Sequence, residues 1–152
     1  MSAVLLEHLT EERVAMEAFL ELLDQEAEAL IQGHFNLLPQ LTERKAQLAD
    51  RIAVLDQERE RQQQASGYPA NRQGADAVAA ASGPGLQQVW HELLERAAQA
   101  RESNHRNGVL IHTHLDFVRQ SINFMRASGQ NLYGPDGKHK VGMGSGNSIA
   151  AG

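Results

Sequence analysis

Cysteine is absent from this 152-residue chain. Without thiols, the chain cannot form a disulfide framework, a thiolate metal site or a cysteine nucleophile. A chain of this kind suits a reducing compartment, so we expect a cytoplasmic protein.

Aromatic residues and prolines are also scarce. Aromatic residues make up 5% of the chain, with Trp90 as the single tryptophan, and there are four prolines. Any core must therefore be mainly aliphatic. The abundance of Ala, Leu, Gln, Glu and Arg favours helix over sheet. We predict an all-α protein, in which a helical hairpin and a long C-terminal helix form an elongated, coiled-coil-like bundle with a flexible tail.

Long apolar runs are missing as well. The N-terminal segment MSAVLLEHLTEER lacks the basic start and apolar stretch of a secretory signal, and no run is long enough to cross a bilayer. The net charge is −7 over residues 1–64 and +2 over residues 65–152, with no dense basic patch. We therefore expect a soluble protein without direct membrane insertion and without a nucleic acid partner.

Residues 1–64 have the apolar spacing of two helices. Gly33 is a natural C-terminal cap for the first, Asn36 is placed to cap the second, and Pro39 falls in a first turn, where it is tolerated. Because the turn is short, residues 1–64 are predicted to form an antiparallel hairpin. One apolar seam consists of Leu9, Met16, Leu20, Leu23, Ala27 and Leu30, and the other of Leu38, Leu41, Lys45, Leu48, Ile52, Leu55 and Arg59.

Lys45 is the unusual member of its seam, because a cation among aliphatic residues is costly. We expect its stem to pack along the seam while its ammonium group reaches water or a carboxylate. A role in setting the helix register, or in contacting a partner, is the alternative.

The composition changes at residues 65–85, ASGYPANRQGADAVAAASGPG. This stretch predicts a mobile Gly/Ala-rich linker, in which DAVAAA forms at most a turn or two of unanchored helix. Residues 86–128 are predicted to form a long amphipathic helix, about 60 Å in length if unbroken. Residues 129–152 read as a flexible tail.

Residues 104–125, NHRNGVLIHTHLDFVRQSINFM, contain three histidines and an aspartate. On a helix His112 and His114 lie about 160° apart, so they cannot bind one metal ion. His105, His112 and Asp116 share a polar face, but an exposed His112–Asp116 pair is far more often a solvated ion pair than a metal site. We expect no metal, no cofactor and no catalytic residue.

The same stretch has an unusually wide apolar surface. Two stripes together cover about half of the helix circumference, more than one neighbouring helix usually buries. We expect this helix to contact two partners, or one partner and a client. The stripes consist of Ile111, Leu115, Val118, Ile122 and Met125, and of Leu110, Phe117 and Phe124.

Asn104, Asn107 and Gly108 interrupt the apolar seam that leads from Trp90 to Ile111. Amides in a helical seam cost stability but fix register and partner choice, and glycine lowers helix propensity by about 1 kcal/mol relative to alanine. We predict a soft, polar waist at which the helix bends or leaves its neighbours. The alternative is an ordinary helix end at Asn107–Gly108, followed by a new helix.

Three segments together resemble the FlgN family of flagellar export chaperones. LLDQEAEALIQGHFNLLPQLTERKAQLADRI resembles the first hairpin of the family, and NHRNGVLI resembles its Asn-x-x-Asn-Gly signature. LYGPDG, at residues 132–137, resembles its Tyr-Gly element. The order and spacing of the segments extend the resemblance over most of the chain, except for the Ala- and Gly-rich residues 65–85.

The resemblance implies a small cytoplasmic chaperone that binds the C-terminal amphipathic helices of the hook-filament junction proteins, the flagellar hook-associated proteins. It would prevent their premature assembly and deliver them to the flagellar type III export gate, with the export ATPase as a further partner. Tyr133 and Gly134 would contact the gate. The implied client surface consists of Asn104, Asn107, Gly108, Leu110, Ile111, Leu115, Phe117, Val118, Ile122 and Met125.

Two other classes remain open at the sequence level. A structural coiled-coil adaptor or oligomerisation module would show the same periodicities. A metal-dependent four-helix enzyme could use His105, His112 and Asp116 together with Glu21 or Glu28. Di-iron bundles require a pair of Glu-x-x-His motifs, which the chain lacks, so we do not expect an enzyme.

Overall fold

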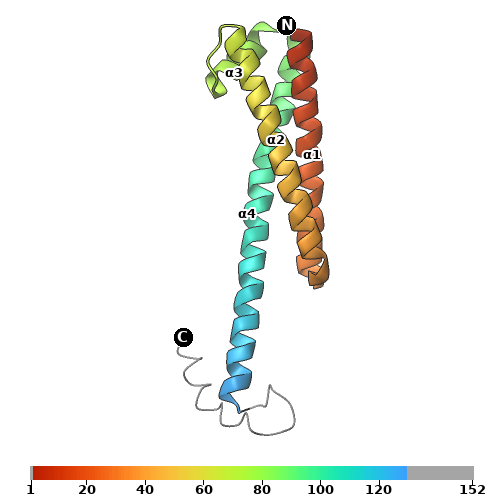
Figure 1. The fold of residues 1–152 in the computed structure, drawn as a ribbon, viewed down its shortest axis with the longest axis vertical. Helices are drawn as coiled ribbons and strands as arrows, with labels where there is room; N and C mark the ends of the chain where they lie inside the picture. The colour runs from red at the N-terminus through yellow and green to blue at the C-terminus, as the bar shows by residue number, and fades with distance from the viewer. Residues whose placement is uncertain (1, 130–152) are drawn as a thin grey trace. The chain divides into compact units, whose positions relative to one another are not determined.

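The computed structural model describes residues 2–129 as helices joined by short turns (Figure 1). The elements are α1 (Ser2–Gln32), the 3-10 turn η1 (Phe35–Leu37), α2 (Leu38–Ala65), α3 (Arg72–Ala81) and α4 (Pro84–Ala127). These residues include no strand, which confirms the all-α prediction. The chain divides into two structural units between Asn107 and Gly108. Within residues 2–129, no helix has the length and hydropathy needed to span a membrane.

Helices α1 and α2 form the predicted antiparallel hairpin (Figure 1). Arg51 pairs with Glu11 at 3.1 Å, whereas Lys45 pairs with Glu26 at 3.2 Å, so early residues of one helix face late residues of the other. Gly33 ends α1 with φ +75°, and the His34 amide donates to the Ala29 carbonyl at 2.8 Å. This left-handed position closes the last turn of α1 and reverses the chain, as the sequence predicted.

The start of α2 differs from the prediction. Asn36 does not cap the helix, because it lies inside η1, and the N-cap position is taken by Leu37 without a side-chain hydrogen bond. Backbone hydrogen bonds connect η1 to α2 instead: the Leu37 amide donates to the His34 carbonyl, and the Leu38 amide donates to the Phe35 carbonyl. Pro39 lies in the first turn of α2, where the loss of an N–H is tolerated.

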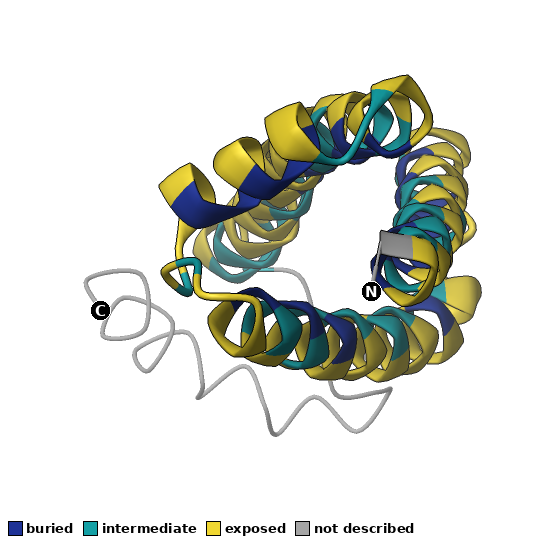
Figure 2. Ribbon diagram, turned by 90° about the horizontal axis from the view of Figure 1, so that it is seen from above, coloured by how far each residue is buried: buried dark blue, intermediate teal, exposed yellow. Residues whose placement is uncertain are grey.

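Residues 84–107 of α4 complete the first unit by packing parallel to α1. Arg13 donates to Glu92 at 2.7 Å, and Asn107 donates to the Leu23 carbonyl at 2.8 Å, so both helices progress in the same direction. Buried residues lie mainly on the sides of the helices that face one another (Figure 2). The main core cluster contains Leu5, Leu9, Ala75, Val78, Ala79, Leu86, Trp90 and Leu93.

The prediction of a mobile linker over residues 65–85 is wrong. Residues 72–81 form α3, and its Ala75, Val78 and Ala79 are each at most 5% exposed in the main core cluster. These positions follow the i, i+3, i+4 spacing of a helix with one buried side. Because two of the three side chains are alanine, the stripe is easily mistaken for low-complexity sequence.

Two hydrogen bonds and one close backbone approach anchor α3. The Asn71 side chain accepts a hydrogen bond from the Gly74 amide at 2.8 Å, a standard N-cap. A Cβ atom at Gly74 would lie 1.8 Å from the Pro69 carbonyl oxygen, so only glycine permits this close approach. The Trp90 indole donates to Asp76 at 2.7 Å, which connects α3 to α4 and lowers the pKa of the Asp76 carboxyl.

A buried polar network around Arg59 joins the same elements. The guanidinium donates to Glu12 at 2.9 Å and to Gln63 at 2.7 Å, and it also pairs with Asp56. It lies over the Trp90 ring, 5.1 Å from the ring centroid, close enough for a cation–π contact. The Gln63 amide in turn donates to the Pro69 carbonyl at 3.0 Å. Arg59, the last residue of the predicted α2 seam, therefore has hydrogen-bond and ion-pair partners for its guanidinium group.

Glu12, which is 3% exposed, is the one member of this network with a strongly shifted pKa. Burial raises the pKa of its carboxyl from 4.5 to about 7; the Arg59 guanidinium opposes this shift, and the Asp56 carboxyl adds to it. As the pH rises, the unfolded chain therefore loses the Glu12 proton near pH 4.5, whereas the folded protein keeps this proton until about pH 7.

The resulting pH dependence of stability has a definite sign. Between pH 4.5 and pH 7 the folded state binds more protons at Glu12 than the unfolded state, so the free energy of unfolding should fall by about 3 kcal/mol as the pH rises. Urea unfolding of the protein and of Glu12→Gln, at pH 5 and pH 8, measures this loss. The variant should lose much less stability over the interval, and equal losses would show that Glu12 is ionised throughout.

Candidate functional site

A small polar cluster joins α1, α2 and α4 close to the end of the first unit. The Asn107 side chain, 1% exposed, donates to the Leu23 carbonyl at 2.8 Å and to the Glu26 carboxylate at 2.9 Å. The Lys45 ammonium group donates to Glu26 at 3.2 Å and to the Asn104 side-chain oxygen at 2.8 Å. We call Glu26, Lys45, Asn104 and Asn107 the polar junction.

The polar junction explains the unusual cation in the α2 seam. The sequence predicted that the Lys45 ammonium group would reach either water or a carboxylate. It reaches the buried carboxylate of Glu26, and the Lys45 side chain is 25% exposed. Asn107 faces the seam as predicted, whereas Asn104 lies exposed at its edge and contacts Lys45. Buried polar groups that are mutually bonded in this way favour one register of the helices over its alternatives.

Gly108 follows the polar junction directly. The helix does not end there, since α4 extends from Pro84 to Ala127, and the predicted alternative of an end at Asn107–Gly108 is wrong. A Cβ atom at Gly108 would meet nothing within 4 Å, so packing does not require glycine at this position. Asn107 is nevertheless the last buried residue of the described chain, and the unit boundary falls directly after it.

The helical residues after Gly108 expose large apolar side chains. Phe124 is 70% exposed, Phe117 66%, Leu115 50% and Val118 37%. Leu110, Ile111, Ile122 and Met125 are only half-buried, and none of residues 108–129 is buried. We call the eight side chains from Leu110 to Met125 the apolar face. Soluble chains rarely leave so many large apolar groups together in water unless they contact a partner.

Three potential metal ligands of α4, namely His105, His112 and Asp116, lie at exposed positions. Asp116 pairs with Arg119 at 3.7 Å and not with His112, contrary to the predicted pair. His105 and His112 are exposed, as are Glu21 and Glu28 on α1. The sequence does contain one Glu-x-x-His motif, Glu102 to His105, but residues 2–129 contain no group of three potential metal ligands.

Two predicted site residues cannot be placed. Tyr133 and Gly134, expected to contact the export gate, lie outside the described residues. The remaining predicted site residues all lie on α4, between Asn104 and Met125. The predicted surface thus falls into two parts: Asn104 and Asn107 in the polar junction, and the apolar residues after Gly108.

Comparison with known proteins identifies related chains. The family model described as FlgN protein matches residues 1–140. A flagella synthesis protein FlgN of Yersinia enterocolitica is 30% identical over 128 residues, which cover 82% of each chain. Another, from Yersinia enterocolitica serotype O:8, is 28% identical over 136 residues, which cover 88% of this chain and 87% of the relative. No solved structure matches the chain.

Truncation of Asn107 should cost much more than truncation of Asn104. Asn107→Ala removes two buried hydrogen bonds, one to the Glu26 carboxylate and one to the Leu23 carbonyl. We therefore expect a loss of about 1–3 kcal/mol in the free energy of unfolding. Asn104→Ala removes one exposed contact and should cost less than about 0.5 kcal/mol. Urea unfolding curves of both variants measure the difference. Similar losses would mean that the buried bonds of Asn107 do not hold α4 against α1.

Proposed function

The chain belongs to the FlgN family, as the resemblance predicted, and we propose that it is a cytoplasmic export chaperone for the hook-filament junction proteins. Its relatives bear the name flagella synthesis proteins, and the FlgN family is not a known enzyme family. In this proposal the apolar face binds the C-terminal amphipathic helices of the clients, prevents their premature assembly and keeps them ready for export.

The observation that carries this proposal is the contrast between the two parts of α4. Trp90, Leu93 and Ala100 are at most 6% exposed, whereas Leu115, Phe117 and Phe124 are 50% exposed or more. Fully burying one such side chain is worth about 1.5–3 kcal/mol, so a partner that covers several of them gains substantial affinity. Recognition of an amphipathic helix requires this kind of surface and no catalytic group.

The shape of the apolar face also suits a helical client. Ile111, Leu115, Val118, Ile122 and Met125 recur at intervals of four and three residues, the spacing that presents one continuous seam. The flanking phenylalanines, Phe117 and Phe124, widen this seam and provide large contact areas. A client helix that buries its own apolar seam here would no longer expose the surface through which it assembles.

Delivery to the export machinery is the second half of the proposal. It is supported by the family membership and by the LYGPDG segment at residues 132–137, in which Tyr133 and Gly134 would contact the export gate. The export ATPase is proposed as a further partner on the same basis. A deletion of residues 132–137 should leave client binding intact and abolish delivery, which separates the two activities.

Leu115→Asp tests the assigned apolar face. The substitution places a carboxylate in the centre of the seam, so it should weaken binding of the C-terminal helix of a junction protein by more than about 2 kcal/mol. Titration calorimetry with such a peptide measures the loss. Asn123→Asp, on the polar side of the same helix and away from both apolar stripes, is the matched control and should bind normally. Unchanged affinity of Leu115→Asp would disprove the assignment.

A structural adaptor is the competing function, and proteolysis separates the two. In a chaperone without its client, residues 108–128 should be cleaved readily and should become resistant when the client peptide is added. An adaptor that covers the apolar face with its own chain or a second copy should resist cleavage throughout, with and without peptide. Equally slow cleavage of residues 108–128 in both conditions would favour the adaptor.

A further inference from the structure

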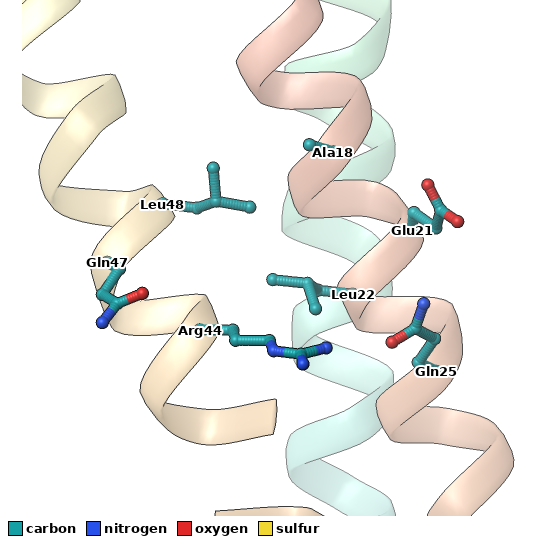
Figure 3. A pocket seen from close by; sticks show the side chains of 7 residues that line it. All are labelled: Ala18, Glu21, Leu22, Gln25, Arg44, Gln47 and Leu48. Atoms are coloured by element: carbon teal, nitrogen blue, oxygen red, sulfur yellow. The ribbon is translucent and has the colours of Figure 1, made fainter. Parts of the chain in front are cut away.

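The hairpin carries a groove along one side of α1 and α2, within the first unit. It consists of two adjoining cavities of about 430 Å³ and 510 Å³, which share Glu21, Gln25 and Arg44 as lining residues. Figure 3 shows Leu22 of α1 and Leu48 of α2 pointing toward one another across this space, with Arg44 extending from α2 toward α1. The residues of the polar junction do not line this groove.

The floor of the groove is apolar. Leu22 and Leu41 belong to the second core cluster, together with Ala29, and are 8% and 7% exposed. Leu48 is partly buried against this cluster, and Leu37, which lines the second cavity, remains 43% exposed. The groove therefore offers aliphatic side chains that a third helix can pack against.

The α1 edge of the groove carries three carboxylates. Glu21, Asp24 and Glu28 recur along one edge at intervals of three and four residues, and all three are exposed. Within residues 2–129 none of them forms an ion pair, and Arg44, the one basic lining residue, is not paired with them. Other carboxylates of α1 do pair with a basic side chain, namely Glu11, Glu12, Glu17 and Glu26.

We propose that this groove binds a cationic amphipathic helix of a partner protein. The aliphatic side chains of the partner would pack on Leu22, Leu41 and Leu48. Its Lys or Arg side chains, spaced by three and four residues, would pair with the unpaired carboxylates on α1. Ala18 to Glu28 extend over about 15 Å of helix, so the docking segment comprises about three turns. The net charge of −7 over residues 1–64 disfavours a second hairpin as the occupant.

The groove and the apolar face belong to different structural units. The groove belongs to the first unit, and its residues come from α1, the end of η1 and α2. The groove proposal therefore uses none of the residues of the apolar face.

The test uses two synthetic helical peptides of about 14 residues with the same leucine seam. One carries four Lys and the other four Glu along one flank. Fluorescence anisotropy with the full chain should show at least tenfold tighter binding of the Lys peptide. The combined variant Glu21→Gln, Asp24→Asn, Glu28→Gln should remove that preference. The control variant Glu7→Gln, Asp50→Asn, Glu102→Gln removes the same charge at exposed positions outside the groove and should keep it.

Three outcomes would overturn the proposal. Equal loss in both combined variants would mean that the Lys peptide responds only to net charge. Loss in Leu115→Asp, with the groove variant unaffected, would place the peptide on the apolar face. A concentration-dependent dimer that the groove variant abolishes would make a second copy the occupant. Binding of the Lys peptide that survives Leu115→Asp but not the groove variant supports the proposal, whatever the outcome of the client experiments.

Discussion

One buried carboxylate, that of Glu26, connects the three helices of the first unit at a single point. It lies on α1 and is 3% exposed, which would be prohibitive for an unpaired charge. Lys45 from α2 and Asn107 from α4 both donate to it. Because the two donors come from different helices, this carboxylate ties the register of all three helices together: a slide of α2 or α4 by a turn would remove one donor from the buried carboxylate, and a slide of α1 would remove both.

The polar junction also separates two kinds of apolar surface on one helix. Before it, the apolar side chains of α4 are used to build the first unit, while after it they remain available. In the proposed function, stability and client binding therefore depend on different residues. A substitution in the apolar face can change affinity without unfolding the hairpin, because residues 108–127 contribute no buried side chain to the described structure.

Most of the fold could be predicted from spacing alone. The two hairpin helices, the Gly33 turn and the seams with Lys45 and Arg59 follow from apolar periodicity, which is strong in long helices. The α3 helix could not be predicted in this way, because its buried stripe is two alanines and a valine within a Gly-rich segment. Its signals were Asn71 as an N-cap and the spacing of Ala75, Val78 and Ala79.

The candidate site was only partly predictable for a different reason. Periodicity identifies an apolar face, but it does not say whether another helix covers it, and this decides between core and binding surface. The partner of Lys45 was equally hidden, since Glu26 is 19 residues away on another helix. Glu12 and the groove carboxylates look alike in sequence, yet burial raises the pKa of Glu12, while Glu21, Asp24 and Glu28 remain exposed.

The contacts that hold α4 to α1 have a consequence for the order of folding. The Gly33 turn joins neighbours in sequence, whereas Arg13 and Glu92 are 79 residues apart and Asn107 and Leu23 are 84 apart. Closing such long loops costs chain entropy, so the hairpin should assemble first and recruit α4 afterwards. During synthesis the hairpin can leave the ribosome before α4 exists, and until then the α1 surface that α4 later covers is open to other chains.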